Sequence, residues 1–183
     1  MRYRIPIVNA REDLLNSGQG IIAETFPTEL ATSSQALTTS CIYFQSISLR
    51  AGETITNIIS VVGTAGTATL AVYQGIYTSA AALAASTTNQ VNSLSSTGQK
   101  TTPLAATYTV PTSGLYYIAT LSSATTTNPA FVKGPSLFVA SAGAIGSGVK
   151  RAGIQTGQAT LPGTATIAAP AATTDWPFWF GVS

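Results

Sequence analysis

The stretch TYTVPTSGLYYIATL, residues 107–121, decides the fold class of this chain. Apolar and polar residues alternate in two short runs on either side of a Pro-x-x-Gly break. Alternation with a period of two is typical of a half-buried β-strand, and proline and glycine are typical of turns. The stretch therefore predicts a strand, a turn and a second strand. In the second strand, Tyr116 and Ile118 should share one face, and Tyr117 and Leu121 the other.

The same pattern recurs along the chain from Cys41 onward. The runs CIYFQSISL, TITNIISVV and ATLAVYQGIY are separated by the glycine-containing turns RAGET and GTAG, and a further short strand is expected at residues 83–86. The glycine-rich stretch 143–157 has no regular spacing and indicates a loop. Many short strands with frequent turns and almost no helical pattern indicate a β-sandwich. We predict an all-β, jelly-roll-like β-sandwich domain over residues 36–183.

The first 35 residues differ from the rest in charge. Of the six carboxylates in the chain, four lie in the first thirty residues, together with three of the eight basic residues. The run VNAREDLLNSGQG has the signature of a short helix, with Asn9 as N-cap, Glu12 as its capping-box partner and Gly18 as the stop. We predict that residues 1–35 form an N-terminal arm with one short helix, which lies against the body or against a neighbour.

The composition of the chain points to a surface with few ions. Charged residues make up 8% of the 183 residues, against about 25% in an average soluble domain. The chain is instead rich in Thr (29), Ala (28) and Ser (19), which favours strands and closely packed surfaces. This bias indicates that copies or partners cover much of the outside. The alternative is an ordinary polar, weakly charged surface.

The pattern of charge and hydropathy excludes two kinds of partner. The net charge is +2 with no basic cluster, whereas phosphate binding needs several Lys or Arg on one face, so we expect no nucleic acid. No apolar run approaches the roughly 20 residues of a membrane span, so we expect no membrane partner. The start MRYRIPIVNARED has no continuous apolar stretch of the secretory type. We therefore expect a protein made as a soluble product in the cytoplasm.

Residues that carry catalysis are scarce. The chain has no histidine, its single cysteine is Cys41, and no carboxylate lies between Glu53 and Asp175. These absences leave no Ser-His or Cys-His pair, no credible zinc site and no paired acids for glycoside hydrolysis. The run GAIGSGVKR lacks the order of a phosphate-binding loop. The sequence thus predicts a protein that is not an enzyme, with no catalytic, cofactor-binding or metal-binding residues.

The aromatic residues allow two interpretations. On a sheet face they could form a platform that stacks against sugars, or they could be core residues and cross-strand pairs. The C-terminal aromatic cluster could likewise be a final strand that seals the sandwich or an apolar patch that meets a neighbouring subunit. The residues of the possible platform are Tyr43, Tyr73, Tyr77, Tyr108, Tyr116, Tyr117, Trp176 and Trp179, and those of the cluster are Trp176, Phe178, Trp179 and Phe180.

The order of these motifs resembles a known family. The segments RYRIPIVNAREDLLNSGQGIIAETFP, LRAGETITNIISVV, TGQKTTPLAATYTVPTSGLYYIATL and the ending WFG are similar to those of small β-sandwich structural proteins of tailed bacteriophages. The nearest types are minor tail, fibre-associated and head-decoration proteins of phages that infect actinobacteria. Residues 74–77 differ from the pattern, which has an Asp-containing turn there. The resemblance implies a virion component displayed in many copies, often as trimers, and implies no catalytic residue.

Two functional hypotheses follow. The first is a structural virion protein that self-associates as a trimer and docks on capsid or tail proteins. Its expected assembly contacts are Arg2, Tyr3, Arg4 and Arg11 in the arm, and Trp176, Phe178, Trp179 and Phe180 at the C-terminus. The alternative is a carbohydrate-binding module or adhesin that recognises host-surface glycan through tyrosine and tryptophan platforms.

Overall fold

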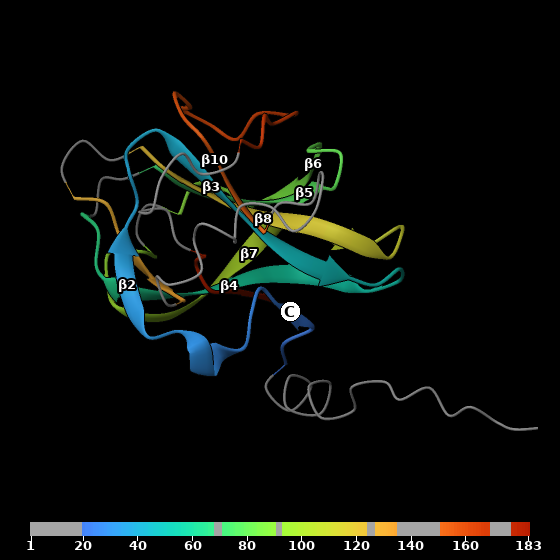
Figure 1. Cartoon of the computed structure of the whole chain (residues 1–183), viewed down its shortest axis with the longest axis horizontal. Helices are drawn as coiled ribbons and strands as arrows, with labels where there is room; N and C mark the ends of the chain where they lie inside the picture. Colours follow the sequence, from blue (N-terminus) through green and yellow to red (C-terminus); the bar gives the residue numbers. More distant parts are fainter. Residues whose placement is uncertain (1–19, 68–70, 91–92, 124–126, 135–150, 169–176) are drawn as a thin grey trace, which may run out of the picture.

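The structure is a computed structural model of the 183-residue chain and describes residues 20–67, 71–90, 93–123, 127–134, 151–168 and 177–183. Within these residues two antiparallel sheets pack against each other as a β-sandwich (Figure 1). The all-β prediction is confirmed. The only helical element of the described residues is the 3-10 turn η1, Thr28–Leu30. The short helix predicted around Asn9 to Gly18 lies outside the described residues.

In the described part of the chain, eleven strands form the two sheets, and every pairing between these strands is antiparallel. Sheet A has the order β1-β11-β4-β9-β2, with β7 paired to β4. Its strands are β1 (Ala23–Glu24), β2 (Ser33–Ala36), β4 (Thr54–Thr64), β7 (Gly98–Thr109), β9 (Ala130–Lys133) and β11 (Phe180–Val182). Sheet B has the order β10-β3-β8-β5-β6. Its strands are β3 (Cys41–Leu49), β5 (Val72–Thr78), β6 (Leu83–Ser86), β8 (Gly114–Ser122) and β10 (Ala152–Gln155).

The chain winds like a jelly roll. β3 pairs with β8, β4 with β7 and β5 with β6, so that each pair encloses the next along the sequence. The chain therefore follows one long hairpin folded over itself, with the β4–β7 pair in sheet A and the other two pairs in sheet B. Nested antiparallel pairs of this kind are typical of jelly rolls, and the predicted β-sandwich is confirmed. The short strand expected at residues 83–86 is β6, and residues 74–77 lie within β5.

The stretch 107–121 connects the two sheets. β7 ends at Thr109 in sheet A, and β8 begins at Gly114 in sheet B after the Pro-x-x-Gly turn. At the same end of the sandwich, the predicted RAGET turn joins β3 to β4. Its Gly52 has a φ of 88°, a backbone conformation that glycine adopts without strain, and its N–H donates to the carbonyl of Val110 at 2.9 Å.

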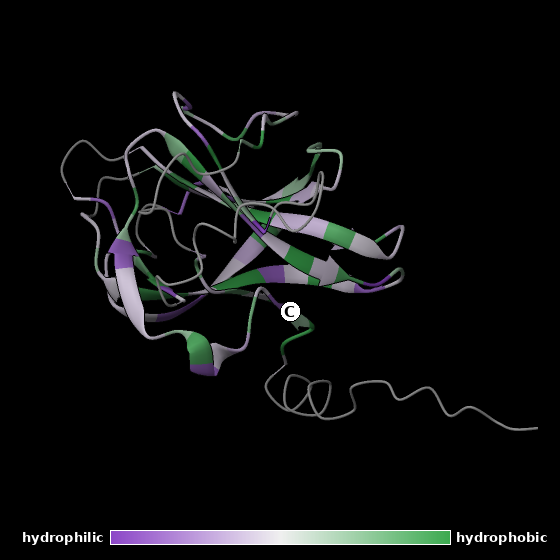
Figure 2. Cartoon of the chain, in the orientation of Figure 1, coloured by the Kyte–Doolittle hydropathy of each residue, from purple (hydrophilic) through white to green (hydrophobic). Residues whose placement is uncertain are grey.

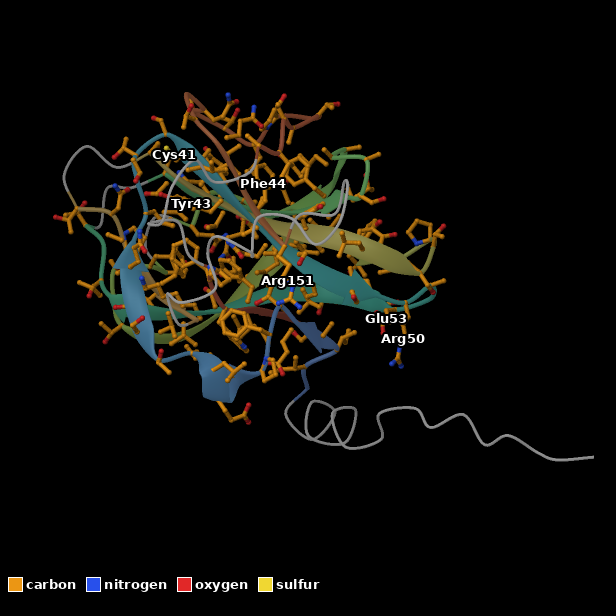
Figure 3. The ribbon with its side chains drawn as sticks, viewed as in Figure 1. Cys41, Tyr43, Phe44, Arg50, Glu53 and Arg151 are labelled. Atoms are coloured by element: carbon orange, nitrogen blue, oxygen red, sulfur yellow. The ribbon has the colours of Figure 1, made fainter. Side chains whose placement is uncertain are left out.

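The side chains of sheet B alternate between two hydrophobic clusters. Tyr116 and Ile118 of β8 point into the core between the sheets, whereas Tyr117 and Leu121 point to the outer face of sheet B, as predicted. Consecutive residues of β3 divide in the same way, and Tyr43 and Phe44 are labelled in Figure 3. Figure 2 shows the resulting change between hydrophobic and hydrophilic residues along the strands.

Residues 156–168 fold over the outer face of sheet B. Leu161 and Ile167 pack against the cluster on this face, and the hydroxyl of Tyr77 donates to the carbonyl of Pro162 at 2.7 Å. Both faces of sheet B are therefore buried along β3 and β8. This burial explains why apolar residues follow one another in β3, where a half-exposed strand would alternate strictly.

Residues 152–155 form strand β10, so the prediction of a loop throughout 143–157 is wrong for this part. β10 pairs with β3, and Gly153 lies opposite Phe44. A Cβ atom on Gly153 would run into the side chain of Ile167. The glycine here allows the covering segment to approach the strand closely, and glycine content alone does not reveal that role. Residues 143–150 of the predicted loop lie outside the described residues.

Residues 20–31, called here the N-terminal strap, cross the outer face of sheet A. The strap starts beside β11, where β1 pairs with it, and leads to β2 at the other side of the sheet. Of the predicted arm, residues 20–35 thus lie along the sandwich, and the boundary at residue 36 falls inside β2. Residues 1–19 of the arm lie outside the described residues.

Candidate functional site

The C-terminal aromatic segment, residues 177–183, is built into sheet A. Phe180 lies opposite Ser60 of β4, and just before it the N–H of Trp179 donates to the carbonyl of Val132 at 3.0 Å. The segment is therefore extended, and successive side chains point to opposite faces of the sheet. Phe178 and Phe180 point into the core between the sheets, and Trp179 points outward.

Phe178 and Phe180 close the main core with edge-on ring contacts. The ring centroid of Phe178 lies 5.3 Å from that of Tyr43 and 6.2 Å from that of Phe131, and the ring planes are inclined by 84° and 69°. Phe180 contacts the same Phe131 at 5.8 Å. Such inclined pairs are favoured because the positive ring edge meets the negative ring face. Both phenylalanines are fully buried, so this part of the segment acts as a sealing strand.

Trp179 belongs to a second, smaller core beneath the N-terminal strap. Its side chain is 3% exposed and packs with Ile21 of the strap and Ile59 of β4. The indole N–H donates to Oε2 of Glu24 at 2.9 Å, and the hydroxyl of Thr28 donates to the same oxygen at 3.0 Å. The carboxylate therefore ties the strap to the C-terminal segment. Sequence reasoning missed this partner, because nothing in the pattern relates residues 155 positions apart.

The predicted assembly contacts fall into two groups. Phe178, Trp179 and Phe180 lie close together but are buried inside their own chain, in the two cores described above. Of the two interpretations of the C-terminal cluster, the packing supports the sealing strand. Trp176, and the arm residues Arg2, Tyr3, Arg4 and Arg11, lie outside the described residues.

Most tyrosines of the possible sugar platform are core residues. The exposed fractions of Tyr43, Tyr77, Tyr116 and Tyr117 are 1%, 0%, 5% and 5%. The hydroxyl of Tyr116 donates to the carbonyl of Thr112 at 2.8 Å, and burial raises the pKa of Tyr77 well above its usual range. These rings therefore serve packing.

Two tyrosines of the possible platform are only partly buried, Tyr73 on β5 and Tyr108 on β7. The ring of Tyr108 makes an edge contact with Tyr116 at 6.4 Å. Burial raises the pKa of Tyr108 to about 12, with smaller contributions from a hydrogen bond and a charge interaction with Tyr116. Tyr73 packs against the outer cluster of sheet B.

Charged side chains are sparse over the described part of the chain. They are Glu24, Glu29, Arg50, Glu53, Lys100, Lys133 and Arg151. Arg50 and Glu53 flank the turn between β3 and β4 (Figure 3), where the Glu53 carboxylate accepts a hydrogen bond from the Arg50 N–H at 2.7 Å. Lys133 donates to Oε1 of Gln35 at 3.1 Å, and desolvation lowers the pKa of this lysine.

The described surface carries few charges without being apolar. Among the described residues, the one large hydrophobic side chain that is exposed is Leu30 of η1, at 51%. Among the described strands, β7 has the longest surface of exposed, uncharged side chains. Its exposed side chains are those of Gln99, Thr101, Pro103, Ala105, Ala106, Thr107 and Thr109.

Two negative findings hold for the residues that the structure describes. No group of three His, Cys, Asp or Glu side chains there is arranged to hold a metal ion. None of the described residues form a helix with the length and apolar character needed to cross a membrane. The thiol of Cys41, at the start of β3, is buried.

Comparison with known proteins adds no functional assignment. No protein-family model matches this chain, and no curated protein matches it either.

Proposed function

We propose that this protein is a structural component of a tailed-phage virion, a β-sandwich that self-associates and is displayed on the particle. The resemblance of its motifs to minor tail, fibre-associated and head-decoration proteins motivates this assignment, and the trimer is the oligomer that the resemblance implies. The carrying observation is that, in the described part of the sandwich, the surface is polar with few charges and the aromatic residues lie mainly inside.

The physical argument concerns the free energy of desolvation. Burying a charged group in an interface removes it from water at a large cost that pairing does not always offset. Thr, Ser, Ala and Gln side chains avoid this cost, and small side chains allow close approach of two backbones. The exposed side of β7 is an example, since it carries only neutral polar and small apolar side chains over most of its length. A surface of this kind suits permanent contact with copies of the same chain.

The charged N-terminal arm is the segment proposed to dock on other virion proteins. Three basic residues lie within its first eleven positions, at Arg2, Arg4 and Arg11. The test is a deletion of residues 1–19, followed by assay of incorporation into particles. The deletion should stop before Gly20, because the strap that follows buries Ile59 and Trp179. We expect a folded protein that no longer joins the particle, and undiminished incorporation would refute the role of the arm.

Self-association is tested by placing a charge on the exposed side of β7. Thr101→Arg introduces an ion on this surface, and Thr166→Arg is a matched control on the segment that covers the opposite sheet, where Thr166 is also exposed. We expect Thr101→Arg to lower the oligomer fraction and the control to leave it unchanged. Equal oligomer fractions in both variants would exclude the β7 surface as the contact.

Glycan recognition remains the second candidate, and the observation that bears on it is the position of the aromatic rings. Tyr73 and Tyr108 are the platform tyrosines that keep partial exposure. A glycan array on the purified protein distinguishes the two functions. Saturable sugar binding that is lost in Tyr73→Ala or Tyr108→Ala would favour an adhesin, whereas an array without binding would count against glycan recognition.

A further inference from the structure

Four polar side chains are buried in the middle of the main core. Ser60, Gln74, Thr102 and Thr120 are at most 1% exposed. Five of their atoms have no hydrogen-bond partner among the described residues: the three hydroxyl oxygens and both polar atoms of the Gln74 amide. Buried polar atoms almost always have a partner, so a group of five is an observation that needs a physical cause.

The four side chains face the space between the sheets. Gln74 is flanked two residues away on each side by Val72 and Ile76, which both belong to the main core, and Ser60 is flanked in the same way by Ile58 and Val62. Side chains two positions apart on a strand share a face.

Cross-strand pairing places the four residues in two neighbouring pairs, one in each sheet. Gln74 of β5 lies directly opposite Thr120 of β8 in sheet B. In sheet A, Ser60 of β4 lies opposite Lys100 of β7, which places Thr102 at the diagonal position on the same face. Direct and diagonal cross-strand neighbours have Cβ atoms about 5 to 8 Å apart.

Contacts on one flank place the two pairs at the same level of the sandwich. Thr120 lies opposite Tyr43 of β3, whose ring touches that of Phe178 in the other sheet. Phe178 is two residues before Phe180, and Phe180 lies opposite Ser60. The row that contains Thr120 therefore faces the row that contains Ser60.

Contacts on the other flank lead to the same arrangement. The N–H of Gln74 donates to the hydroxyl of Thr87 at 3.0 Å, and Thr87 forms a bridge to Leu104 of β7. Leu104 follows two residues after Thr102 on the same face of the strand. Gln74 is thus connected to the Thr102 side of sheet A, and the four side chains converge on one region of the interior.

We infer that this region is a binding site for water inside the sandwich. Each polar atom left unpartnered in a core lowers the folding equilibrium constant by roughly five- to 150-fold. Five such atoms together would destabilise the fold by about as much as the whole stability of an ordinary domain. A buried water typically makes about three hydrogen bonds to otherwise unsatisfied groups. The amide of Gln74 offers donors and an acceptor, and the three hydroxyls offer both, so about two waters satisfy the cluster.

Water contact is tested by nuclear magnetic resonance on the full, ¹⁵N-labelled chain. The side-chain amide signals of Gln74 are those that disappear in Gln74→Met. We expect nuclear Overhauser cross-peaks between these protons and long-lived bound water. The side-chain amide of Asn57, which donates to Thr56 and Ser183, serves as the control because it lies toward the surface. Cross-peaks from Gln74 to core protons with none to water would overturn the inference.

Removal of a hydroxyl group provides an independent test, because the direction of the change in the folding constant depends on whether water is bound. Thr120→Val keeps the shape of the side chain. If the hydroxyl binds water, the change lowers the folding constant about fivefold, and if the core is dry the change raises it. Thr166→Val, at an exposed position outside the proposed β7 contact, is the control and should stay within about twofold of wild type. A more stable Thr120→Val variant would refute the site even if the amide signals could not be assigned.

Discussion

Truncation of Phe178 should strongly destabilise the domain. Its side chain is fully buried and makes edge contacts with Tyr43, Phe131 and Phe180 at centroid distances of 5.3, 6.2 and 6.5 Å. Deleting a buried phenylalanine ring costs about 3–5 kcal/mol, and here three ring contacts are lost together. Because small domains have a stability of only about 5–15 kcal/mol, Phe178→Ala should remove a large part of it.

Urea denaturation followed by circular dichroism measures this effect. With a typical slope of about 2 kcal/mol per molar urea, the midpoint should fall by roughly 1.5–2.5 M. Leu30→Ala is the matched control, since Leu30 is half exposed, and its midpoint should change little. A Phe178→Ala variant with less than about 1 kcal/mol of destabilisation would refute the assignment of this segment as a sealing strand.

Three further predictions follow from contacts of single side chains. Gly153→Ala should lower the melting temperature, because the added Cβ meets Ile167, and combining it with Ile167→Ala should restore part of the loss. Glu24→Gln should change the fluorescence of Trp179 through the altered indole hydrogen bond, and an unchanged spectrum would argue against that bond. The pKa of Tyr108 is raised from 10.0 to about 12, so unfolded chains lose this proton first and stability should fall as pH rises from about 10 to 12. Tyr108→Phe should reduce that alkaline loss in a series of denaturation curves.

The period-two alternation of β8 is sufficient to assign its two faces from the sequence. Tyr116 and Ile118 separate from Tyr117 and Leu121 because a strand has only two sides, and both sides of this strand are buried. The sequence predicts a jelly-roll-like class of fold but not the individual strand pairs, because alternation does not specify which strands pair.

The covering segments could not be predicted in the same way. The N-terminal strap and residues 156–168 are mostly irregular, so they carry no periodic signal. Their packing depends on single features, such as Gly153 beneath Ile167, which a glycine-rich stretch conceals.

The C-terminal aromatic cluster shows where sequence reasoning stops. Adjacent aromatics cannot all face one core from one strand, and this was apparent from the spacing. In the structure these aromatic residues are divided between two cores. Phe178 and Phe180 lie in one, and Trp179 lies in the other. The second core exists only because the strap supplies Ile21 and Glu24, and those residues are remote in sequence.

The most direct test of the proposed assembly is the mass of the protein in solution. Size-exclusion chromatography with light scattering on the purified chain should give a small integral multiple of 18.7 kDa, and three copies is the number expected. Because the proposed contacts involve few charges, this mass should stay the same between low and high ionic strength. A mass of 18.7 kDa at every concentration and salt would contradict self-association.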